Sequence, residues 1–124
     1  MIWAARAEVI EVIDGDTFHA NLDIGWGIML RPRRKNLAAG QPRGLGTVRV
    51  LHPGGRPFDA PEIATHAGKR AATYARTLAA VGEHLEIASY EIDDFGRTLA
   101  AVKLGDGSDW ATVMTEAGFV KVRP

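Results

Sequence analysis

The first part of the chain alternates between apolar and polar positions, as a β-strand does when one of its faces is buried. Residues 7–13 (Ala-Glu-Val-Ile-Glu-Val-Ile) are rich in β-branched side chains, and residues 16–24 alternate again with Phe18 and Leu22 on one face. The two runs flank an Asp-Gly pair, which forms tight turns and is typical of a β-hairpin. A third apolar segment, 27–30, follows a Gly-Trp-Gly bend.

A different period begins near residue 65. Apolar side chains then recur every three or four residues, which predicts an α-helix over 65–81, with Gly82 in the place of a C-terminal cap. A strand is predicted before this helix at 47–51, followed by a turn at 52–55 that contains Pro and two Gly.

After the helix the pattern predicts strands at 84–90 and 97–104, and then a short last helix. Ser108 or Asp109 caps the start of that helix, which ends at Gly118. The order is three strands, a helix, two strands and a helix. It predicts a mainly β fold with helices (α+β): a five-stranded Greek-key barrel of the OB type, with one helix between the third and fourth strands and a short C-terminal helix.

The length of 124 residues suits a single domain over 1–124. The chain has no cysteine, which excludes disulfide scaffolds, cysteine-ligated zinc and thiol catalysis. It has no apolar run of the roughly 20 residues that a membrane span needs, and its first residues lack the features of a signal peptide. We therefore expect a cytoplasmic protein without a membrane role.

The net charge of zero hides an uneven distribution. Segment 31–56 holds seven basic residues and no acid, so the rest of the chain has an acidic excess of the same size. This segment is either a solvated loop or a surface for a polyanion such as nucleic acid. Most of it is an Arg-rich loop at about 31–46, which we interpret as inserted and exposed. Its first candidate contacts to nucleic acid are Arg31, Arg33, Arg34 and Lys35.

Three short motifs stand at the ends of predicted strands. They are residues 12–17 (Val-Ile-Asp-Gly-Asp-Thr), 59–62 (Asp-Ala-Pro-Glu) and 93–97 (Asp-Asp-Phe-Gly-Arg). Each alone has a structural explanation, because Asp-Gly and Phe-Gly occur in hairpin turns and Asp-Ala-Pro-Glu can begin a helix. The three in this order carry more information than any one of them.

Together the motifs resemble those of the staphylococcal nuclease (thermonuclease-like) family, which are Val-x-Asp-Gly-Asp-Thr, Arg-x(4)-Asp-(Thr/Ala)-Pro-Glu and Asp-x-Tyr-Gly-Arg. The likeness covers roughly residues 7–122 apart from the Arg-rich loop. The family fold is an OB barrel with helices. The resemblance implies a calcium-dependent phosphodiesterase that cleaves DNA, RNA or both with little sequence specificity. We expect the protein to act as a monomer.

By motif position, the resemblance assigns Asp16 and Asp59 as carboxylate ligands of one Ca²⁺, together with the backbone carbonyl of Ala60. Calcium prefers hard oxygen ligands of this kind. Glu62 would orient or deprotonate the attacking water, and Arg97 would neutralise charge on the phosphorus.

The family's second arginine is displaced in this chain. In the family it precedes the aspartate of the second motif by five residues, where this sequence has Gly54. Arg49 precedes Asp59 by ten residues and keeps the role if the intervening residues bulge out; Arg56 is the alternate. We prefer Arg49, because the strand predicted at 47–51 matches the family strand in kind.

The third motif also departs from the family, since Asp94-Phe95 stands where Lys-Tyr is usual. Phe95 can stack on a base or sugar but has no hydroxyl for the phosphate. The alternative function is therefore a catalytically weak or inactive relative that binds single-stranded nucleic acid or a protein partner. We interpret Trp3, Trp26 and Trp110 as anchors of the small core rather than as platforms for bases.

Overall fold

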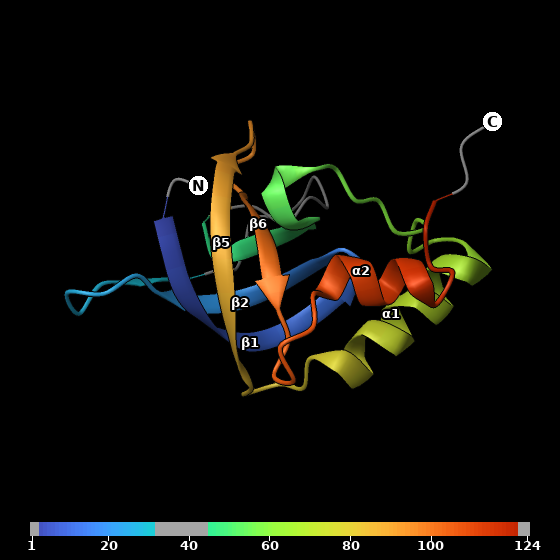
Figure 1. Cartoon of the computed structure of the whole chain (residues 1–124), viewed down its shortest axis with the longest axis horizontal. Coiled ribbons are helices and arrows are strands. Elements are labelled where there is room, and N and C mark those ends of the chain that lie inside the picture. Colours follow the sequence, from blue (N-terminus) through green and yellow to red (C-terminus); the bar gives the residue numbers. More distant parts are fainter. Residues whose placement is uncertain (1–2, 32–44, 122–124) are drawn as a thin grey trace.

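Five strands close into a barrel in the computed structural model, which describes residues 3–31 and 45–121 (Figure 1). Their order is β1-β5-β6-β4-β2, and β1 also pairs with β2, which completes the ring. A short β3 pairs with the end of β2 outside the ring. The strands are β1 (Trp3–Asp14), β2 (Thr17–Asp23), β3 (Met29–Leu30), β4 (Thr47–Leu51), β5 (His84–Ile92) and β6 (Thr98–Lys103).

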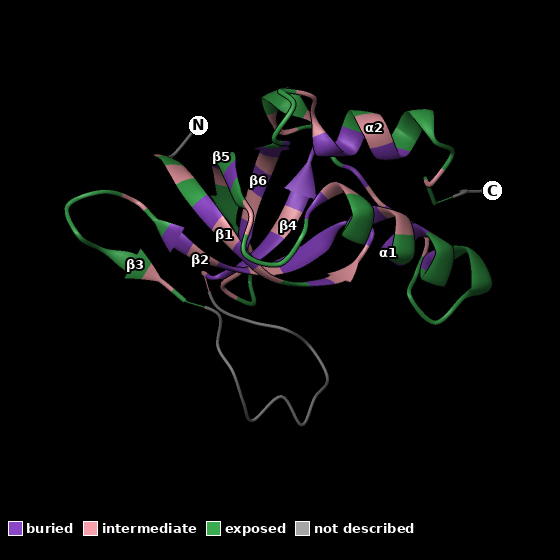
Figure 2. Ribbon diagram, turned by 90° about the horizontal axis from the view of Figure 1, so that it is seen from below, coloured by how far each residue is buried: buried purple, intermediate pink, exposed green. Residues whose placement is uncertain are grey.

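Apolar and polar residues alternate along the strands, and the apolar ones form the core, as the sequence predicts. On β2, Phe18, Ala20 and Leu22 are fully buried, and Val48 and Val50 of β4 complete the same layer. Figure 2 shows the buried positions as bands on the strands. All strand pairs are antiparallel except that of β4 with β6. The predicted mainly β fold with a closed five-stranded barrel and two helices is confirmed.

The two helices, α1 (His66–Leu78) and α2 (Trp110–Glu116), lie on the same side of the barrel (Figure 1). The α1 face toward the barrel consists of small residues, so the helix approaches the strands closely; its buried positions are Gly68, Ala71, Ala72 and Ala75. Asp109 caps α2 by accepting a hydrogen bond from Thr112 N, as one of the two predicted caps.

The predicted end of the first helix at Gly82 is wrong. The helix ends at Leu78 because Ala79 is already extended, with φ of −135°. Gly82 instead makes the turn into β5, where its φ of 89° requires glycine. Its N–H donates to Val9 O at 2.7 Å, and Val9 N donates to Glu83 O at 2.9 Å, so this turn is attached to β1.

The three tryptophans have different surroundings. Trp110 is fully buried and stacks on Phe18, with ring centroids 5.0 Å apart, and is the core anchor that we expected. Trp3 is partly buried against the core. The prediction for Trp26 is wrong, because this residue is 98% exposed at the turn between β2 and β3. Among the described residues, no helix is long and apolar enough to cross a membrane.

Candidate active site

The turn between β1 and β2 presents a buried carboxylate. Asp16 is only 6% exposed, and both of its side-chain oxygens accept hydrogen bonds. Thr17 Oγ1 donates to Oδ1 at 2.9 Å, and Ala60 N donates to Oδ2 at 3.0 Å. The Asp16 carbonyl also accepts from Val50 N at 2.8 Å. The second motif thus holds the carboxylate of the first motif in one orientation.

Small residues allow the first two motifs to touch. A Cβ at Gly15 would lie 2.6 Å from Ala60 Cβ and 3.1 Å from Ala71 Cβ, so glycine is required here by close packing. The Gly15 carbonyl accepts a hydrogen bond of 2.9 Å from Trp110 Nε1. The core tryptophan therefore fixes the backbone of the turn that carries Asp16.

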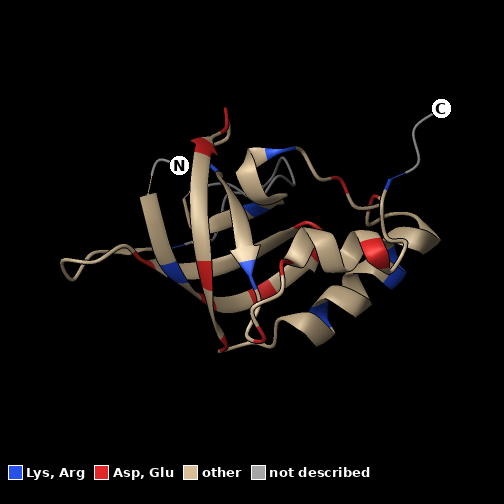
Figure 3. Cartoon of the chain, viewed as in Figure 1, with Lys and Arg blue, Asp and Glu red and all other residues tan. Residues whose placement is uncertain are grey.

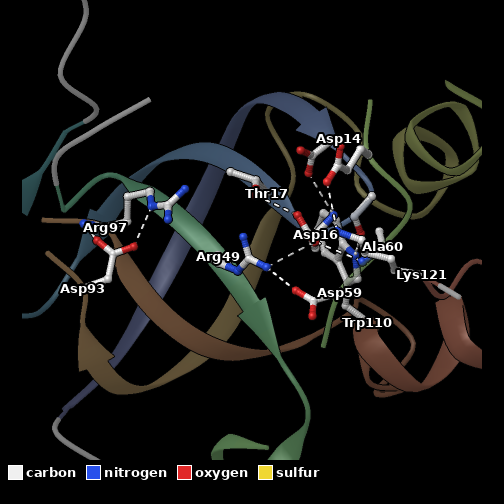
Figure 4. Close-up of polar contacts among 12 residues, drawn as sticks. Asp14, Asp16, Thr17, Arg49, Asp59, Ala60, Asp93, Arg97, Trp110 and Lys121 are labelled. Atoms are coloured by element: carbon white, nitrogen blue, oxygen red, sulfur yellow. Dashed lines mark hydrogen bonds and ion pairs between the residues drawn. The ribbon is translucent and has the colours of Figure 1, made fainter. Parts of the chain in front are cut away.

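Arg49 connects the two predicted calcium ligands (Figure 4). Its Nη2 donates a hydrogen bond to Asp59 Oδ1 and lies 3.7 Å from Asp16 Oδ2. Strand pairing explains this position, because Arg49 lies opposite Thr17, the residue after Asp16. The structure thus brings together Asp16, Asp59 and Arg49, which are far apart in the sequence.

The residues between Arg49 and Asp59 bulge out as a loop. This is the arrangement in which Arg49 is predicted to take the place of the family's second arginine. His52 N donates to Arg56 O at 2.9 Å and closes a loop that contains the short 3-10 helix η1 (Pro53–Gly55). Arg56 lies exposed in this loop. Gly54 N donates to Tyr90 Oη at 3.1 Å, so a side chain of β5 attaches the loop to the barrel.

Glu62 lies at the edge of this cluster in an exposed position. Its Oε1 accepts a hydrogen bond of 2.9 Å from Lys121 Nζ. Lys121 also donates from its backbone N–H to the Asp59 carbonyl at 2.8 Å. Thr65 Oγ1 donates to the Glu62 carbonyl at 2.7 Å and, as the helix cap, accepts from Gly68 N. The backbone of Glu62 is therefore fixed, and its exposed carboxylate is paired with Lys121.

Arg97 makes an ion pair of its own. Its Nε lies 2.6 Å from Asp93 Oδ2, and its guanidinium lies 5.3 Å from the centre of the Phe95 ring. Figure 4 shows the Asp93–Arg97 pair separated from the cluster around Arg49. The structure therefore does not bring Arg97 to the predicted calcium ligands, and that side chain has to turn to reach a phosphate there.

Burial raises the pKa of the Asp93 carboxyl, but hydrogen bonds from Arg97 N, Arg97 Nε and Phe95 N outweigh it, and the pKa is lowered. A lowered pKa stabilises the fold above the ordinary value of 3.8, and this contribution is lost as the pH falls through the lowered value. Asp93→Asn should therefore cost about 1–2 kcal/mol at pH 7, and this cost should fall as the pH drops below 3.8. Urea unfolding of both proteins in a series of pH values from 7 to below 3.8 measures this; a loss that does not change with pH would contradict it.

Asp14, the last residue of β1, is bonded to the turn that carries Asp16. Burial, followed by the hydrogen bond and the charge of Asp16, raises the pKa of Asp14 to about 7. Its Oδ1 accepts a hydrogen bond of 3.0 Å from Asp16 N. A proton on Asp14 is therefore retained to a much higher pH than on an ordinary aspartate.

The donor set fits a hard divalent cation. The carboxylates of Asp16 and Asp59 both face Nη2 of Arg49, so the electrostatic potential between the two carboxylates favours a positive charge. Both oxygens of Asp16 are held by hydrogen bonds, and carboxylate oxygens are the hard ligands that a divalent cation such as calcium prefers. Within residues 3–31 and 45–121, no group of three or more His, Asp or Glu side chains suited to a metal is found. The expected set has two carboxylates and a backbone carbonyl.

Of the predicted nucleic-acid contacts, Arg31 and Phe95 are exposed. Arg33, Arg34 and Lys35 lie outside the described residues. Figure 3 shows acidic and basic residues interspersed over the described part of the chain.

Sequence reasoning did not find the residues that support the site, Asp14, Thr17, Tyr90, Trp110 and Lys121. For Thr17 a signal was present, since it ends the first motif and its hydroxyl is next to Asp16. For Trp110 and Lys121 no local signal exists, because their partners are distant in the sequence.

No family model matches the chain, and no curated protein matches its sequence. The order of the motifs and the geometry of the site therefore carry the functional argument.

Proposed function

We propose that the chain is a Ca²⁺-dependent nuclease, similar to the staphylococcal nuclease family, that hydrolyses phosphodiester bonds of DNA, RNA or both with low sequence specificity. The observation that carries this proposal is the contact of Arg49 with both Asp16 and Asp59. A phosphodiesterase site needs a cation beside its metal-binding carboxylates, and here the displaced arginine reaches them. A Greek-key OB-type arrangement, a monomeric state and a cytoplasmic location belong to the same proposal.

Asp16, Asp59 and the Ala60 carbonyl are the groups that would hold Ca²⁺. The bound ion would supply positive charge that stabilises the phosphate oxygens. Because Ala60 N already donates to Asp16, the two motifs would present their oxygens together. Arg49 would shift from the carboxylates to a phosphate oxygen, where it would neutralise the charge that develops in the transition state.

Glu62 would accept the proton of the attacking water. Its exposed carboxylate is paired with Lys121 at the surface, and substrate binding would have to separate the pair. Arg97 would leave Asp93 to contact the phosphate from another direction. Both changes are side-chain rotations, which are common on binding and need no movement of the backbone.

A second function is favoured by these same ion pairs. Lys121 holds Glu62 and Asp93 holds Arg97, so two of the three side chains proposed for catalysis have other partners. A protein that keeps these pairs would bind single-stranded nucleic acid, or a protein partner, without cleaving.

Digestion of single-stranded DNA, duplex DNA and RNA distinguishes the two functions. With millimolar Ca²⁺ we expect degradation, which EDTA abolishes and Glu62→Ala lowers by at least about 10²-fold. Glu116→Ala, which removes an exposed acid on α2, is the matched control and should retain the full rate.

Intact substrate together with a salt-sensitive gel shift would contradict the nuclease and support the binding function. An unchanged rate in a folded Glu62→Ala variant would contradict the role of Glu62. Neither cleavage nor a gel shift would point to a protein partner.

A further inference from the structure

The ribbon of β2 and β3 projects away from the barrel (Figures 1 and 2), and its turn contains Trp26. Trp26 is 98% exposed, and Ile28 and Met29 beside it are 48% and 42% exposed. Single apolar side chains are ordinary on a protein surface, but a tryptophan with nearly all of its area in water is not. The proposed nuclease mechanism does not use this residue.

The turn holds the ring in a defined place. Trp26 has a left-handed φ of 59°, between Gly25 at 92° and Gly27 at 74°. Asp23 Oδ1 accepts from Gly25 N at 2.9 Å, and Ile28 N donates to the Gly25 carbonyl at 3.0 Å. A non-glycine residue is costly in the left-handed region, and such strain is typical of functional positions.

The tip lies at the far end of the strand that begins beside the candidate site. Thr17, the first residue of β2, follows Asp16, and β2 then runs six residues to Asp23, which is roughly 20 Å at about 3.3 Å per residue. The outer face of this strand, away from Phe18 and Leu22, carries polar side chains: Thr17 is buried, His19 and Asn21 are half-buried, and Asp23 is exposed. His19 contacts Thr47 of β4 there at 3.1 Å.

Charge indicates which side of this face suits a phosphate backbone. Glu8 and Glu11 of β1 border one side, opposite Asn21 and His19 of β2. On the other side, Arg49 lies on β4, and exposed Arg31 follows β3 directly. Burial lowers the pKa of His19, so its ring is neutral at pH 7 and does not balance the two acids.

The size of the tip favours a nucleobase over a protein surface. A stable protein interface covers about 800 Å² on each partner, which is more than one hairpin turn with three exposed apolar side chains provides. A single indole face is enough for one base, because every base has a π-face on which an aromatic ring can stack.

We propose that Trp26 stacks on a base of single-stranded nucleic acid whose backbone runs from the Asp16–Arg49 site along the outer face of β2 to the ribbon tip. The direction of this strand rests on the proposed nuclease function, whereas stacking at Trp26 does not require cleavage. Trp26 would then give the protein a preference for unpaired substrate several nucleotides away from the scissile bond.

Binding tests the contact without cleavage. Fluorescein-labelled oligothymidylate of about twenty nucleotides, longer than the 4–16 nucleotides that one OB fold covers, is titrated in EDTA and followed by anisotropy. Trp26→Ala should raise Kd about tenfold, and Trp26→Phe should retain most of the affinity. Val81→Ala, which truncates a side chain 76% exposed in the α1–β5 turn, is the matched control and should bind like the unaltered protein.

Cleavage in Ca²⁺ separates this proposal from the proposed function. Trp26→Ala should raise KM for the long oligothymidylate about tenfold and leave kcat/KM for a thymidine dinucleotide unchanged. Weaker binding by Trp26→Ala without cleavage by any protein would support stacking and overturn the nuclease. Normal cleavage and normal binding by this variant would overturn stacking alone. A change in sedimentation with unchanged oligonucleotide binding would overturn it in favour of contact between copies of the chain.

Discussion

Arg49→Ala should lower the rate of DNA cleavage in Ca²⁺ by about 10³-fold, the loss expected when a cation that stabilises a phosphoryl transition state is removed. Arg49 is the guanidinium that reaches both Asp16 and Asp59. The rate is measured with saturating substrate, so that weaker binding does not contribute. Arg56→Ala is the control, because Arg56 lies exposed in the loop that contains η1 and should keep the rate within about twofold.

The affinity for Ca²⁺ shows whether Arg49→Ala loses activity through the missing guanidinium or through damage to the metal site. Arg49 competes with a metal ion for the oxygens of Asp16 and Asp59, so Arg49→Ala should bind Ca²⁺ at least as tightly as the unaltered protein. The rise of Tm with added Ca²⁺ measures this affinity. If Arg49→Ala loses both cleavage and the rise of Tm with Ca²⁺, the metal site itself is damaged and the role of Arg49 is contradicted. If only Arg56→Ala loses cleavage, Arg56 is the second arginine of the site.

Trp110→Ala should lower the free energy of unfolding by about 4 kcal/mol, since the change leaves a large cavity and an unsatisfied carbonyl. The ring is fully buried against Phe18, and its Nε1 donates to the Gly15 carbonyl. Small domains are stable by only about 5–15 kcal/mol, so this loss is a large fraction of the total stability. Urea unfolding followed by circular dichroism measures the loss.

Trp110→Phe separates packing from the hydrogen bond. Phenylalanine keeps a ring against Phe18 but has no N–H for Gly15, and the loss should be about 1–3 kcal/mol. A folded Trp110→Phe protein with weakened Ca²⁺ binding would show that the bond positions the Asp16 turn. A loss below about 1.5 kcal/mol in Trp110→Ala would contradict the anchoring role.

The sequence predicts the barrel strands well because their signal is local. Phe18 and Leu22 alternate with polar residues, and an Asp-Gly turn joins the two runs, so the pattern determines both the pairing and the buried face. The preference for Arg49 comes instead from the resemblance, because the strand at 47–51 matches the family strand in kind. The structure adds the reason that this residue lies beside Asp16, which is that Arg49 pairs with Thr17 across β4 and β2.

The features that the sequence places wrongly have both local and distant causes. Trp26 is apolar and was assigned to the core, but it has no alternating neighbours, and glycines on both sides place it in a turn. Gly82 is a poor indicator of the helix end because its conformation serves a contact with β1. The pairing of Arg97 with Asp93 was foreseeable, since the two are four residues apart on either side of a tight turn.

The bond between Trp110 and Gly15 joins residues 95 positions apart, and it has a consequence for the newly made chain. Chains emerge from the ribosome N-terminal end first, at about 5–20 residues per second. The turn that carries Asp16 emerges first, and the residue that fixes it emerges 95 residues later. Until Trp110 has emerged, a nascent chain therefore holds Asp16 in an unsupported turn, and the proposed hydrolytic activity would begin only after that point of synthesis.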